Sequence, residues 1–519
     1  MNVLLLAPSY PIEEFPSPPL GLCYAAAGFQ TAGCNVQILD FIVQHYSVEK
    51  LEKELDAFRP DIVGTNSVTM NHDEAVSLLK AVKDHDPGII TLMGGPHISF
   101  DYEDTLKNHP EIDIAVIGEG EKTITELVPV IHNRGKWCTI NGIAYMENDH
   151  LVKTPKREFI SDLDTLPQPP RHLLPLSKYL ALGLPVSIIT SRGCPNQCIF
   201  CVGSKMVGQK FRTRSVSLIL DEIQSLIEIG FEQINFADDF FTVNKKRVKA
   251  ICAEIKARNL NFGWSIFARA DSVNRDILQT MKDAGCHTVL FGIESGNQEM
   301  LDRINKRIKL NQIKQAIILC KDVGMRVLGS FIVGLPGETS ETLMDSHKLA
   351  QELDVPYGYH FLSPFPGTTL KEEITDYDLQ LLTHDWSKFD ANQAIVRTSS
   401  LSPEEITQFV EDYSNKKNRS DAEELAKRFA QGQCTPTELL VIHGNQKMDV
   451  VYALLSKDVI ESLDAFPKSN GSELGLLVED ISRRIQKKPE IVKPAMEHLI
   501  SHGYVKKEEG GGKIKWVWT

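Results

Sequence analysis

The chain has 519 residues, a formal net charge of −13 and 42% hydrophobic residues. This length predicts about three domains, and the acidic balance argues against broad nucleic-acid binding. Ten cysteines are too few for a disulfide scaffold and indicate a reducing compartment. The N-terminus has no basic leader region, and no apolar run reaches the ~20 residues of a membrane span, so we expect a cytoplasmic protein.

Residues 1–150 alternate between short apolar runs and amphipathic segments. This alternation predicts an α/β domain of the doubly wound, Rossmann-like kind, which binds ligands at the carboxyl ends of its strands. The expected strands are Val3–Ala7, Val36–Asp40, Ile62–Asn66, Ile89–Met93 and Ile114–Ile117, and the expected helices are Gly21–Ala32, Ser47–Phe58, Asn71–Asp84 and Glu121–Asn133. No GxGxxG sequence follows the first strand, which argues against an ordinary dinucleotide site.

Three strand-end loops in this domain have unusual compositions. Residues 65–69 (TNSVT) are small and rich in hydroxyls, residues 94–97 read GGPH, and residues 118–121 read GEGE. Glycines allow backbone to approach a large ligand closely, and the hydroxyls and amides offer hydrogen bonds. Ordinary tight turns between strands and helices are the alternative interpretation.

A proline-rich segment follows at residues 151–180, with the sequence DLDTLPQPP from Asp162 to Pro170. Prolines at this density exclude helix and sheet interiors. We therefore expect an extended strap that joins two domains.

Three cysteines, Cys194, Cys198 and Cys201, come directly after the apolar run Val186–Thr190. A thiolate-rich loop at the end of a strand can hold a metal centre. Iron–sulfur clusters usually take four protein ligands, so a cluster held by three would leave one iron open to a small molecule. A zinc knuckle would need a fourth nearby ligand, and no second Cys pair or Cys/His pair follows.

Residues 181–375 resume the alternation of strands and helices. The expected strands are Val186–Thr190, Gln233–Ala237, Phe262–Phe267, Thr288–Gly292, Arg326–Val333 and Tyr357–Phe361, and the expected helices are Val216–Ile229, Lys245–Arg258, Arg275–Ala284, Leu310–Val323 and Glu341–Leu353. Six such units are too few for a closed eight-stranded barrel. They predict an open, partial (β/α)6 barrel of the TIM kind, with its chemistry at the carboxyl ends of the strands.

Charged and glycine-rich residues follow these strands. Asp238 and Asp239 could bind a metal, act as acid and base, or accept hydrogen bonds from an ammonium group, and an exposed acidic turn is the alternative. Arg269 could pair with a carboxylate or form a structural ion pair. The glycine-rich segments Gly292–Gly296 and Gly334–Thr339 suit close contact with a ribose, a carboxylate or a base.

Residues 376–519 form the C-terminal region. The segment Leu401–Gln431 is predicted to be helical, with Ser402 as its N-cap and Pro403 in its first turn. From about residue 471, two expected helices, Ser472–Lys487 and Pro489–His502, precede a hairpin with a glycine tip at residues 510–512, which resembles a winged helix. The second helix has few basic residues, so we favour a protein-docking or structural role over DNA binding.

Together these motifs resemble a known family. Cys194, Cys198 and Cys201, with the aromatic Phe200 before the last, match the CxxxCxxC signature of the radical S-adenosylmethionine (SAM) enzymes. The N-terminal domain with its GGPH and GEGE loops resembles the cobalamin (B12)-binding domain of one branch of that family. This branch includes anaerobic magnesium-protoporphyrin ester cyclase-like proteins and class B methyltransferases. The resemblance covers residues 1–375.

The resemblance implies three cofactors and their sites. Cys194, Cys198 and Cys201 would hold a [4Fe–4S] cluster whose open iron chelates SAM, and one-electron reduction would cleave SAM to a 5′-deoxyadenosyl radical. The residues implied for SAM are Phe200, Asp238, Asp239, Arg269, Glu294, Ser295, Gly334 and Leu335. Those implied for cobalamin are Thr65, Ser67, Thr69, Gly94, Gly95, His97, Gly118, Glu119 and Gly120. The DxHxxG motif of many B12 proteins is absent, so we expect His97 to line the pocket rather than to bind cobalt.

The activity implied by the resemblance is methyl transfer from methylcobalamin to an unactivated carbon of a small-molecule, peptide or protein substrate, with flavodoxin or ferredoxin as electron donor. Two alternatives within the family are a cyclisation or rearrangement without net methyl transfer, and methylthiotransfer. The latter would require three more cluster cysteines in the N-terminal domain, where only the widely spaced Cys23, Cys34 and Cys138 occur. A B12-sensing regulator that binds DNA is the non-enzymatic alternative.

Overall fold

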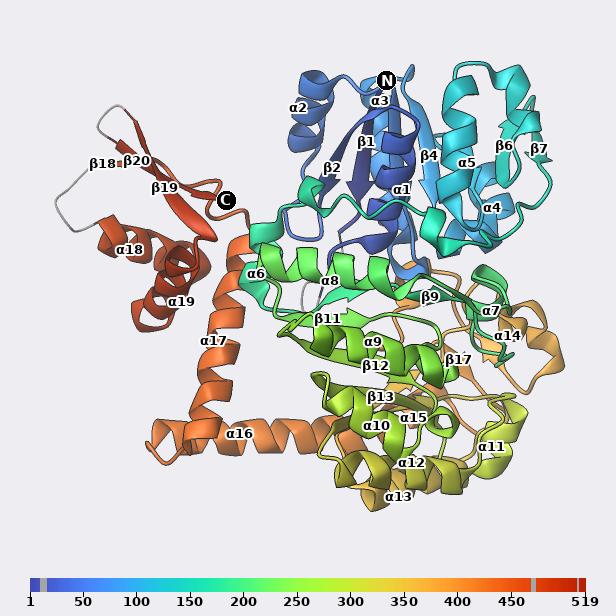
Figure 1. Cartoon of the computed structure of the whole chain (residues 1–519), viewed down its shortest axis with the longest axis vertical. Coiled ribbons are helices and arrows are strands. Elements are labelled where there is room, and N and C mark those ends of the chain that lie inside the picture. Colours follow the sequence, from blue (N-terminus) through green and yellow to red (C-terminus); the bar gives the residue numbers. More distant parts are fainter. Residues whose placement is uncertain (10–15, 468–472, 511–512) are drawn as a thin grey trace.

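The computed structural model describes residues 1–9, 16–467, 473–510 and 513–519. Two α/β units lie one above the other, and a mostly helical C-terminal part lies along one side (Figure 1). The α/β class expected from the sequence is confirmed. Within the described residues, no helix is both long and apolar enough to cross a membrane.

The N-terminal sheet has seven strands in the order β2-β1-β3-β4-β5-β6-β7. Its first five strands are parallel, as predicted, and their order is one of the two common doubly wound arrangements. The strands are β1 (Asn2–Ala7), β2 (Asn35–Asp40), β3 (Ile62–Asn66), β4 (Ile90–Gly94), β5 (Ile114–Val116), β6 (Ile143–Glu147) and β7 (His150–Lys153). The antiparallel hairpin β6–β7 was not expected. Its two turn residues, Asn148 and Asp149, both have positive φ, which suits the right-handed twist of a two-residue hairpin.

Five helices cover this sheet: α1 (Leu20–Thr31), α2 (Val48–Phe58), α3 (His72–His85), α4 (Pro96–Asn108) and α5 (Gly120–Leu127). The GGPH segment is not a loop throughout, because Pro96 occupies the first turn of α4. The helix expected to reach Asn133 ends at Leu127, because Pro129 follows and cannot donate a helical hydrogen bond.

The second sheet is the predicted open barrel. Its six strands are all parallel, in the order β15-β14-β13-β12-β11-β8, with β8 and β15 as the two edges. The strands are β8 (Val186–Ile188), β11 (Gln233–Phe236), β12 (Gly263–Ala268), β13 (Cys286–Glu294), β14 (Arg326–Val333) and β15 (Tyr357–Phe361). The helices between them are α8 (Val216–Ile229), α9 (Lys245–Ala257), α10 (Arg275–Lys282), α11 (Gln298–Arg303), α12 (Leu310–Asp322) and α13 (Ser340–Leu353).

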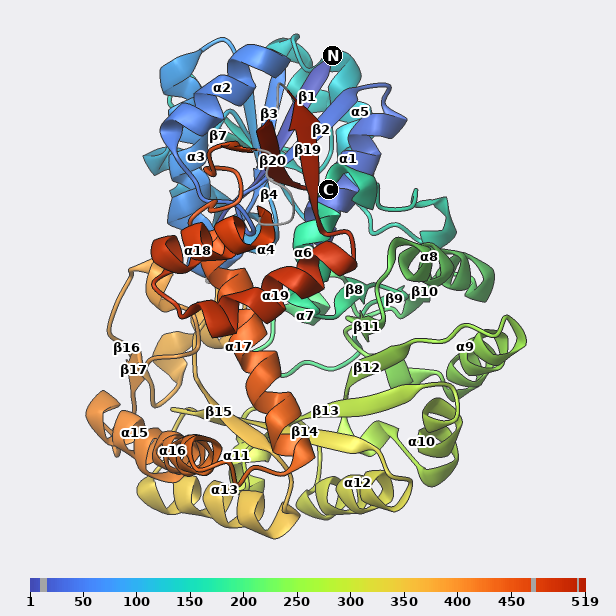
Figure 2. The same ribbon diagram turned by 90° about the vertical axis from the view of Figure 1, so that its left-hand side faces the viewer.

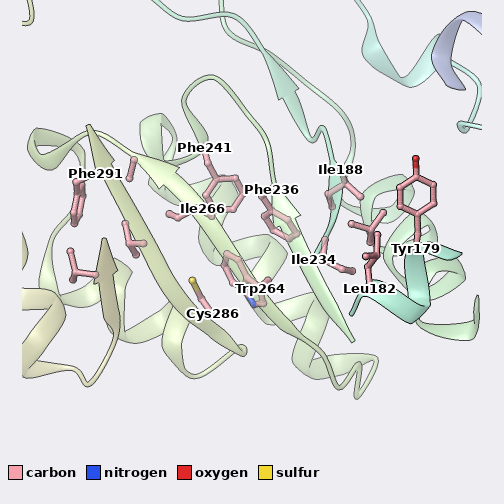
Figure 3. Close-up of a cluster of buried hydrophobic side chains, with 14 of the residues drawn as sticks. Tyr179, Leu182, Ile188, Ile234, Phe236, Phe241, Trp264, Ile266, Cys286 and Phe291 are labelled. Atoms are coloured by element: carbon pink, nitrogen blue, oxygen red, sulfur yellow. The ribbon is translucent and has the colours of Figure 1, made fainter. Parts of the chain in front are cut away.

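Large aromatic side chains fill the space between this sheet and its helices (Figure 3). Trp264 of β12 is fully buried, and its ring stacks on Phe236 with the centroids 4.7 Å apart. The indole Nε1 donates a hydrogen bond to the carbonyl oxygen of Ala284, so no polar group of this ring is left unpaired. Such rings bury 150–250 Å² each and hold the strand ends in fixed positions.

The strap between the two sheets contains short turns and then helix α6 (Leu176–Leu182). The C-terminal part contains α15 (Pro403–Val410), α16 (Lys416–Ala430), α17 (Pro436–Ser456), β18 (Phe466–Pro467), α18 (Glu473–Ile485), α19 (Pro489–Ser501), β19 (Val505–Gly510) and β20 (Lys513–Trp518). Ser402 caps α15 as predicted. Strands β18, β20 and β19 form an antiparallel sheet in that order. The predicted helix start at Ser472 and the glycines at 511–512 lie outside the described residues.

Gly95 provides a test of how tightly the β4–α4 turn is built. Its φ is 104°, and a Cβ atom there would lie 2.5 Å from the carbonyl oxygen of Ser67. We expect Gly95→Ala to destabilise the protein by ~1–3 kcal/mol. Gly94→Ala is the matched control, since its Cβ would meet no atom within 4 Å. Thermal unfolding of the cofactor-free protein measures both, and equal unfolding temperatures would contradict this account.

Candidate functional site

The cysteine loop leaves the barrel at its first strand. A short ribbon, β9 (Ser191–Arg192) paired with β10 (Arg212–Thr213), brackets the loop, and helix α7 (Gly203–Met206) follows it. Gly193 lies at the entry with φ of 109°, and a Cβ there would lie 2.3 Å from the carbonyl oxygen of Lys210. Only glycine therefore allows this close backbone approach, which fixes where Cys194 begins.

Each of the three thiols has its own hydrogen-bond donor. The side-chain amide of Asn196 donates to Cys194 Sγ at 3.4 Å, and the backbone N–H of Gly203 donates to Cys201 Sγ at 3.4 Å. Arg269 Nη1 lies 4.0 Å from Cys198 Sγ. Donors directed at every sulfur suit thiolates, which are the form that binds iron.

A second segment, residues 304–307 after α11, braces the cysteine loop. The backbone N–H of Ile199 donates to the Ile304 carbonyl at 3.2 Å, and the Asn305 side chain donates to the Gln197 carbonyl at 2.7 Å. Asn305 and Arg307 both have φ of 56°, which is unfavourable for residues other than glycine. A residue other than glycine keeps a left-handed backbone conformation only when its surroundings impose it, and here they impose it next to the cysteines.

The two aspartates after β11 have different environments. Asp238 is buried, and its carboxylate accepts hydrogen bonds from the backbone N–H and hydroxyl groups of both Thr190 and Ser191. Asp239 is exposed, and the hydrogen bond it receives from the Gly193 backbone N–H is long, at 3.4 Å. Asp238 thus fastens the strand that leads into the cysteine loop, whereas Asp239 keeps oxygen atoms available for a ligand.

Positive charge gathers beside Cys198. Arg269 is held by Asp271 and by the carbonyl oxygen of Lys306, while Lys306 Nζ pairs with Glu294 Oε1 at 2.6 Å. Glu294 has φ of 66°, another left-handed residue other than glycine. Burial raises the pKa of the Cys198 thiol, and the charges of Lys306 and Arg269 oppose that rise. Phe200 lies close by, with Lys306 Nζ 5.8 Å from its ring centroid.

The remaining residues expected at the SAM site are more deeply placed. Ser295 is fully buried, with its hydroxyl 3.3 Å from that of Ser346. Leu335 is also fully buried, and Gly334 has φ of 85°. The backbone N–H groups of Gly334 and Leu335 both donate to Glu338 Oε2, so this carboxyl group shapes the turn.

The N-terminal α/β unit lies above the barrel (Figure 2). Residues of both units line a cavity of about 350 Å³. Part of its lining is apolar, from Leu5, Leu22, Phe29, Leu92 and Ile124. Six of the nine residues expected to bind cobalamin also line it, namely Thr65, Gly94, Gly95, Gly118, Glu119 and Gly120. The barrel contributes Ile189, Arg192, Met206 and Val207, which flank the cysteine loop on both sides.

The other three residues expected at the cobalamin site do not line this cavity. Ser67 and Thr69 are buried, and the Thr69 hydroxyl lies 3.3 Å from His97 Nδ1. The His97 ring lies between His72, which is tilted against it with the centroids 4.2 Å apart, and Trp386 from the C-terminal part, which meets it edge-to-face at 4.9 Å. The buried His72 has its pKa lowered to about 4, by desolvation and then by His97, so the His72 ring is uncharged at neutral pH.

Buried ion pairs connect the two sheets beside the cavity. The Glu119 carboxylate accepts hydrogen bonds from both terminal nitrogens of Arg212, at 2.9 and 3.0 Å, and from Arg192 Nη1 at 3.1 Å. Arg192 Nη2 also donates to Glu121 Oε1 at 2.5 Å. Burial alone would raise the pKa of Glu119, but the hydrogen bond from Arg212 and the charge of Arg192 hold it below its ordinary value. Glu119 is therefore an ionised link between the two units.

Comparisons with known proteins agree with this geometry. A family model described as the B12 binding domain matches residues 14–128, and one described as the Radical SAM superfamily matches residues 188–350. An uncharacterized methyltransferase of Pyrococcus horikoshii is 36% identical over 76% of this chain and 86% of its own length. An anaerobic magnesium-protoporphyrin IX monomethyl ester cyclase of Rubrivivax gelatinosus is 31% identical over 78% of this chain and 75% of its own.

The chain belongs to the radical SAM enzymes that carry a B12-binding domain. Its cofactors are a [4Fe–4S] cluster, SAM and cobalamin. Solved structures share its fold. The methyltransferase TsrM from Kitasatospora setae, with cobalamin and a [4Fe–4S] cluster bound, has a TM-score of 0.67 and 18% identity over 96% of this chain and 99% of its own. The cobalamin-dependent enzyme OxsB, with aqua-cobalamin and SAM bound, has a TM-score of 0.68 and 18% identity over 96% of this chain and 80% of its own.

The residues of this radical SAM enzyme fit the groups that the family binds. Three thiols, each with a hydrogen-bond donor, fit a cluster, and the exposed Asp239 with the nearby cationic side chains fits an amino acid group. Cβ atoms on Gly21 and Gly94, which line the cavity, would project into open space, as expected of a cradle for a bulky ligand. Cys23 and Cys34 are buried while Cys138 is exposed, which does not suit a second cluster.

Sequence reasoning missed two important residues of the site, Lys306 and Arg192. Arg192 precedes Cys194 by two residues, and this spacing is the one signal that could have pointed to it. Lys306 is distant in sequence from every motif. Its position depends on how residues 304–307 fold against the cysteine loop.

Glu338 gives the site a pH-dependent contribution to stability. Burial raises its pKa from 4.5 to about 8, and the hydrogen bonds from Gly334 and Leu335 offset this only in part. Between these pH values the folded state binds the proton that the unfolded state has lost. The contribution of Glu338 to the free energy of unfolding is therefore fully present below pH 4.5 and is lost as the pH rises through about 8.

We expect Glu338→Gln to remove this pH dependence, because glutamine does not titrate. The free energy of unfolding of the variant minus that of the wild type should therefore increase from pH 5 to pH 8 by on the order of a few kcal/mol. Glu341→Gln is the control, because Glu341 is exposed and lies in the first turn of α13, just after Glu338 in the chain. Denaturant unfolding across this pH range measures the differences. Parallel pH profiles for wild type and Glu338→Gln would contradict the prediction.

Proposed function

We propose that the protein is a cobalamin-dependent radical SAM methyltransferase that acts on an unactivated carbon of a small molecule, peptide or protein. The observation that supports this most is the shared cavity. Strand-end loops of the B12-binding unit and the residues on either side of the cysteine loop line one space, which supports two cofactor sites that face each other. A methyl carrier and a source of carbon radicals must be this close to act on the same substrate.

When bound, SAM at the cluster supplies radical chemistry and cobalamin supplies the methyl group. The chain's own residues hold and orient these groups. Cys194, Cys198 and Cys201 would bind three irons, while Asn196 and the Gly203 backbone N–H hydrogen-bond two of the sulfurs. Donors to cluster sulfurs tune its reduction potential.

Four side chains at the barrel mouth are proposed to orient SAM. Asp239 would accept hydrogen bonds from the ammonium group, because its carboxylate is exposed and only weakly bonded. Arg269 and Lys306 would pair with the carboxylate, since they place positive charge beside Cys198. Glu294 holds Lys306 in place at 2.6 Å, and Phe200 would cover the site. Ser295, Gly334, Leu335 and Asp238 would support the site from behind.

The cavity is proposed to take part of cobalamin, with Thr65, Gly94, Gly95, Gly118 and Gly120 in its lining. The apolar part of the lining suits an aromatic or alkyl portion of the ligand, and the glycines allow backbone to approach a bulky ring system. We propose a supporting rather than a contacting role for Ser67, Thr69 and His97, which lie outside the cavity.

From about residue 471, the C-terminal part is proposed to be a winged-helix-like module with a structural role. The order α18-α19-β19-β20 and the three-stranded sheet that β19 and β20 form with β18 support that assignment. The C-terminal part is fastened to the N-terminal unit, where Asp458 pairs with Lys50 at 2.6 Å, and to α6, where the Ser177 hydroxyl donates to the Thr519 carbonyl at 2.7 Å. Lys493 on α19 is 3.9 Å from Glu497 on the same helix, which weakens any phosphate-binding surface there.

A cyclisation or rearrangement without net methyl transfer is the second candidate, since a cyclase is among the relatives that are at least 30% identical. For either reaction we propose a cytoplasmic location, supported by ten free cysteines, and reduction by a flavodoxin- or ferredoxin-type donor. The proposed domains are residues 1–150 for cobalamin, 151–180 for the strap, 181–375 for the radical SAM core and 376–519 for the C-terminal region.

Labelled SAM tests the proposed activity. We expect anaerobically reconstituted enzyme, given SAM with a deuterated methyl group, cobalamin, a strong reductant and extract small molecules and peptides, to produce a compound that carries the label. Cys198→Ala should lose cluster iron and form neither product nor 5′-deoxyadenosine, whereas the control Cys138→Ala should behave as wild type. Mass spectrometry detects the label. A cobalamin-dependent product without it would favour the second candidate.

The two aspartates after β11 should separate binding from folding. We expect Asp239→Asn to weaken SAM binding by about tenfold or more, the size of a lost hydrogen bond between charged groups, without changing the unfolding temperature. Asp238→Asn should instead destabilise the fold by ~2 kcal/mol or more, because it disrupts a buried carboxylate with four donors. Equilibrium SAM binding and thermal unfolding measure the two effects. A reversed pattern would overturn the assignment of Asp239.

A further inference from the structure

One carboxylate oxygen beside the cavity has no hydrogen-bond partner among the described residues. Glu121, in the first turn of α5, uses Oε1 to accept a hydrogen bond from Arg192 Nη2 at 2.5 Å. Its second oxygen, Oε2, is buried, and no described residue donates a hydrogen bond to it. The residue is only 8% exposed and lines the 350 Å³ cavity as well as a neighbouring cavity bordered by Gly28 and Lys122. A buried charged oxygen left unpaired is costly, so a donor is expected from the molecule that fills the cavity.

Neither the apolar lining beside Glu121 nor Arg192 supplies this donor. The cavity lining beside α5 is apolar, with Phe29, Val116 and Ile124. The nearby Arg192 directs its other terminal nitrogen, Nη1, at Glu119, at 3.1 Å.

We propose that Glu121 Oε2 accepts a hydrogen bond from an N–H or O–H group of bound cobalamin, and that Arg192 holds the carboxylate in position for it. Cobalamin has such groups in the carboxamides around the corrin ring and in the ribose of its nucleotide. Arg192 belongs to the barrel and lies two residues before Cys194. Binding of cobalamin to the N-terminal unit therefore depends on a residue at the entry to the cluster loop. This inference rests on the proposed cobalamin site.

Equilibrium binding to the full-length, cluster-reconstituted protein tests the proposal without relying on turnover. Glu121→Gln keeps the side-chain size but leaves one acceptor oxygen for two donors, so we expect the dissociation constant of hydroxocobalamin, measured by absorbance titration, to rise about tenfold or more. Glu126→Gln is the matched control. It lies on the same helix, also pairs with an arginine, Arg157, and does not line the cavity.

Arg192→Gln and the double variant complete the test. If Arg192 acts by holding Glu121, the double variant should bind cobalamin about as well as the weaker single variant, whereas additive losses would overturn the dependence on Arg192. Iron content and unfolding temperature show whether each variant is folded. Glu121→Gln is the conservative change that keeps the proposal testable if Arg192→Gln fails to fold.

Cobinamide, which has the corrin carboxamides but no nucleotide, identifies the donor. If Glu121→Gln weakens cobalamin and cobinamide equally, the donor is a corrin carboxamide, and if it weakens only cobalamin, the donor is in the nucleotide. Both outcomes support the proposal. Wild-type affinity of Glu121→Gln for both ligands, or an equal loss in Glu126→Gln, would overturn it. Failure of the wild-type protein itself to bind cobalamin would instead overturn the proposed function, and this inference with it.

Discussion

Two α/β units can share a ligand cavity only if something fixes the distance between them, and here buried ion pairs do so. Glu119 and Glu121 of the N-terminal unit face Arg192 and Arg212 of the barrel, and all four side chains are at least nine-tenths buried. Buried pairs add little net stability, because desolvation cancels most of the attraction, but removing one partner costs about 3–5 kcal/mol. The network therefore acts mainly by selecting one relative orientation of the two units.

The cysteine loop has a comparable requirement on a smaller scale. A loop that holds three sulfurs cannot depend on its own short-range hydrogen bonds, and three other segments support it. The Ile304 carbonyl and the Leu370 backbone N–H bond to Ile199 from two elements, and Asp238 anchors the strand that leads into the loop. The left-handed conformations of Asn305 and Arg307 show that this support has a conformational cost.

The sequence allowed prediction of the fold because hydrophobic periodicity is a local property. The five parallel N-terminal strands and the six barrel strands lie where the sequence predicted them, most of them on apolar runs. Features that depend on single residues were harder to predict from the sequence. The GGPH segment looked like a loop, yet Pro96 starts a helix there, and the hairpin β6–β7 was missed because its strands are short.

The site itself was only partly predictable, for a different reason. Motif spacing identified the cysteines, but it could not distinguish Asp238, which supports the fold, from Asp239, which stays available to a ligand. The difference arises from which side chain points back toward Thr190, and this depends on contacts between strands. Glu119 was expected at the cobalamin site and does line the cavity, but its carboxylate is already saturated by Arg192, Arg212 and the backbone N–H of Ile160.

The two cofactor sites differ in how much they depend on the other unit. The supports of the cysteine loop, residues 304–307 and Leu370, all belong to the barrel, so that site is complete within one unit. The cavity is not, because Ile189, Arg192, Met206 and Val207 form part of its wall. Since these four residues flank the cysteines, any shift of the loop also changes the shape of the cavity. The geometry of the cluster loop is therefore one of the conditions for building the proposed cobalamin site.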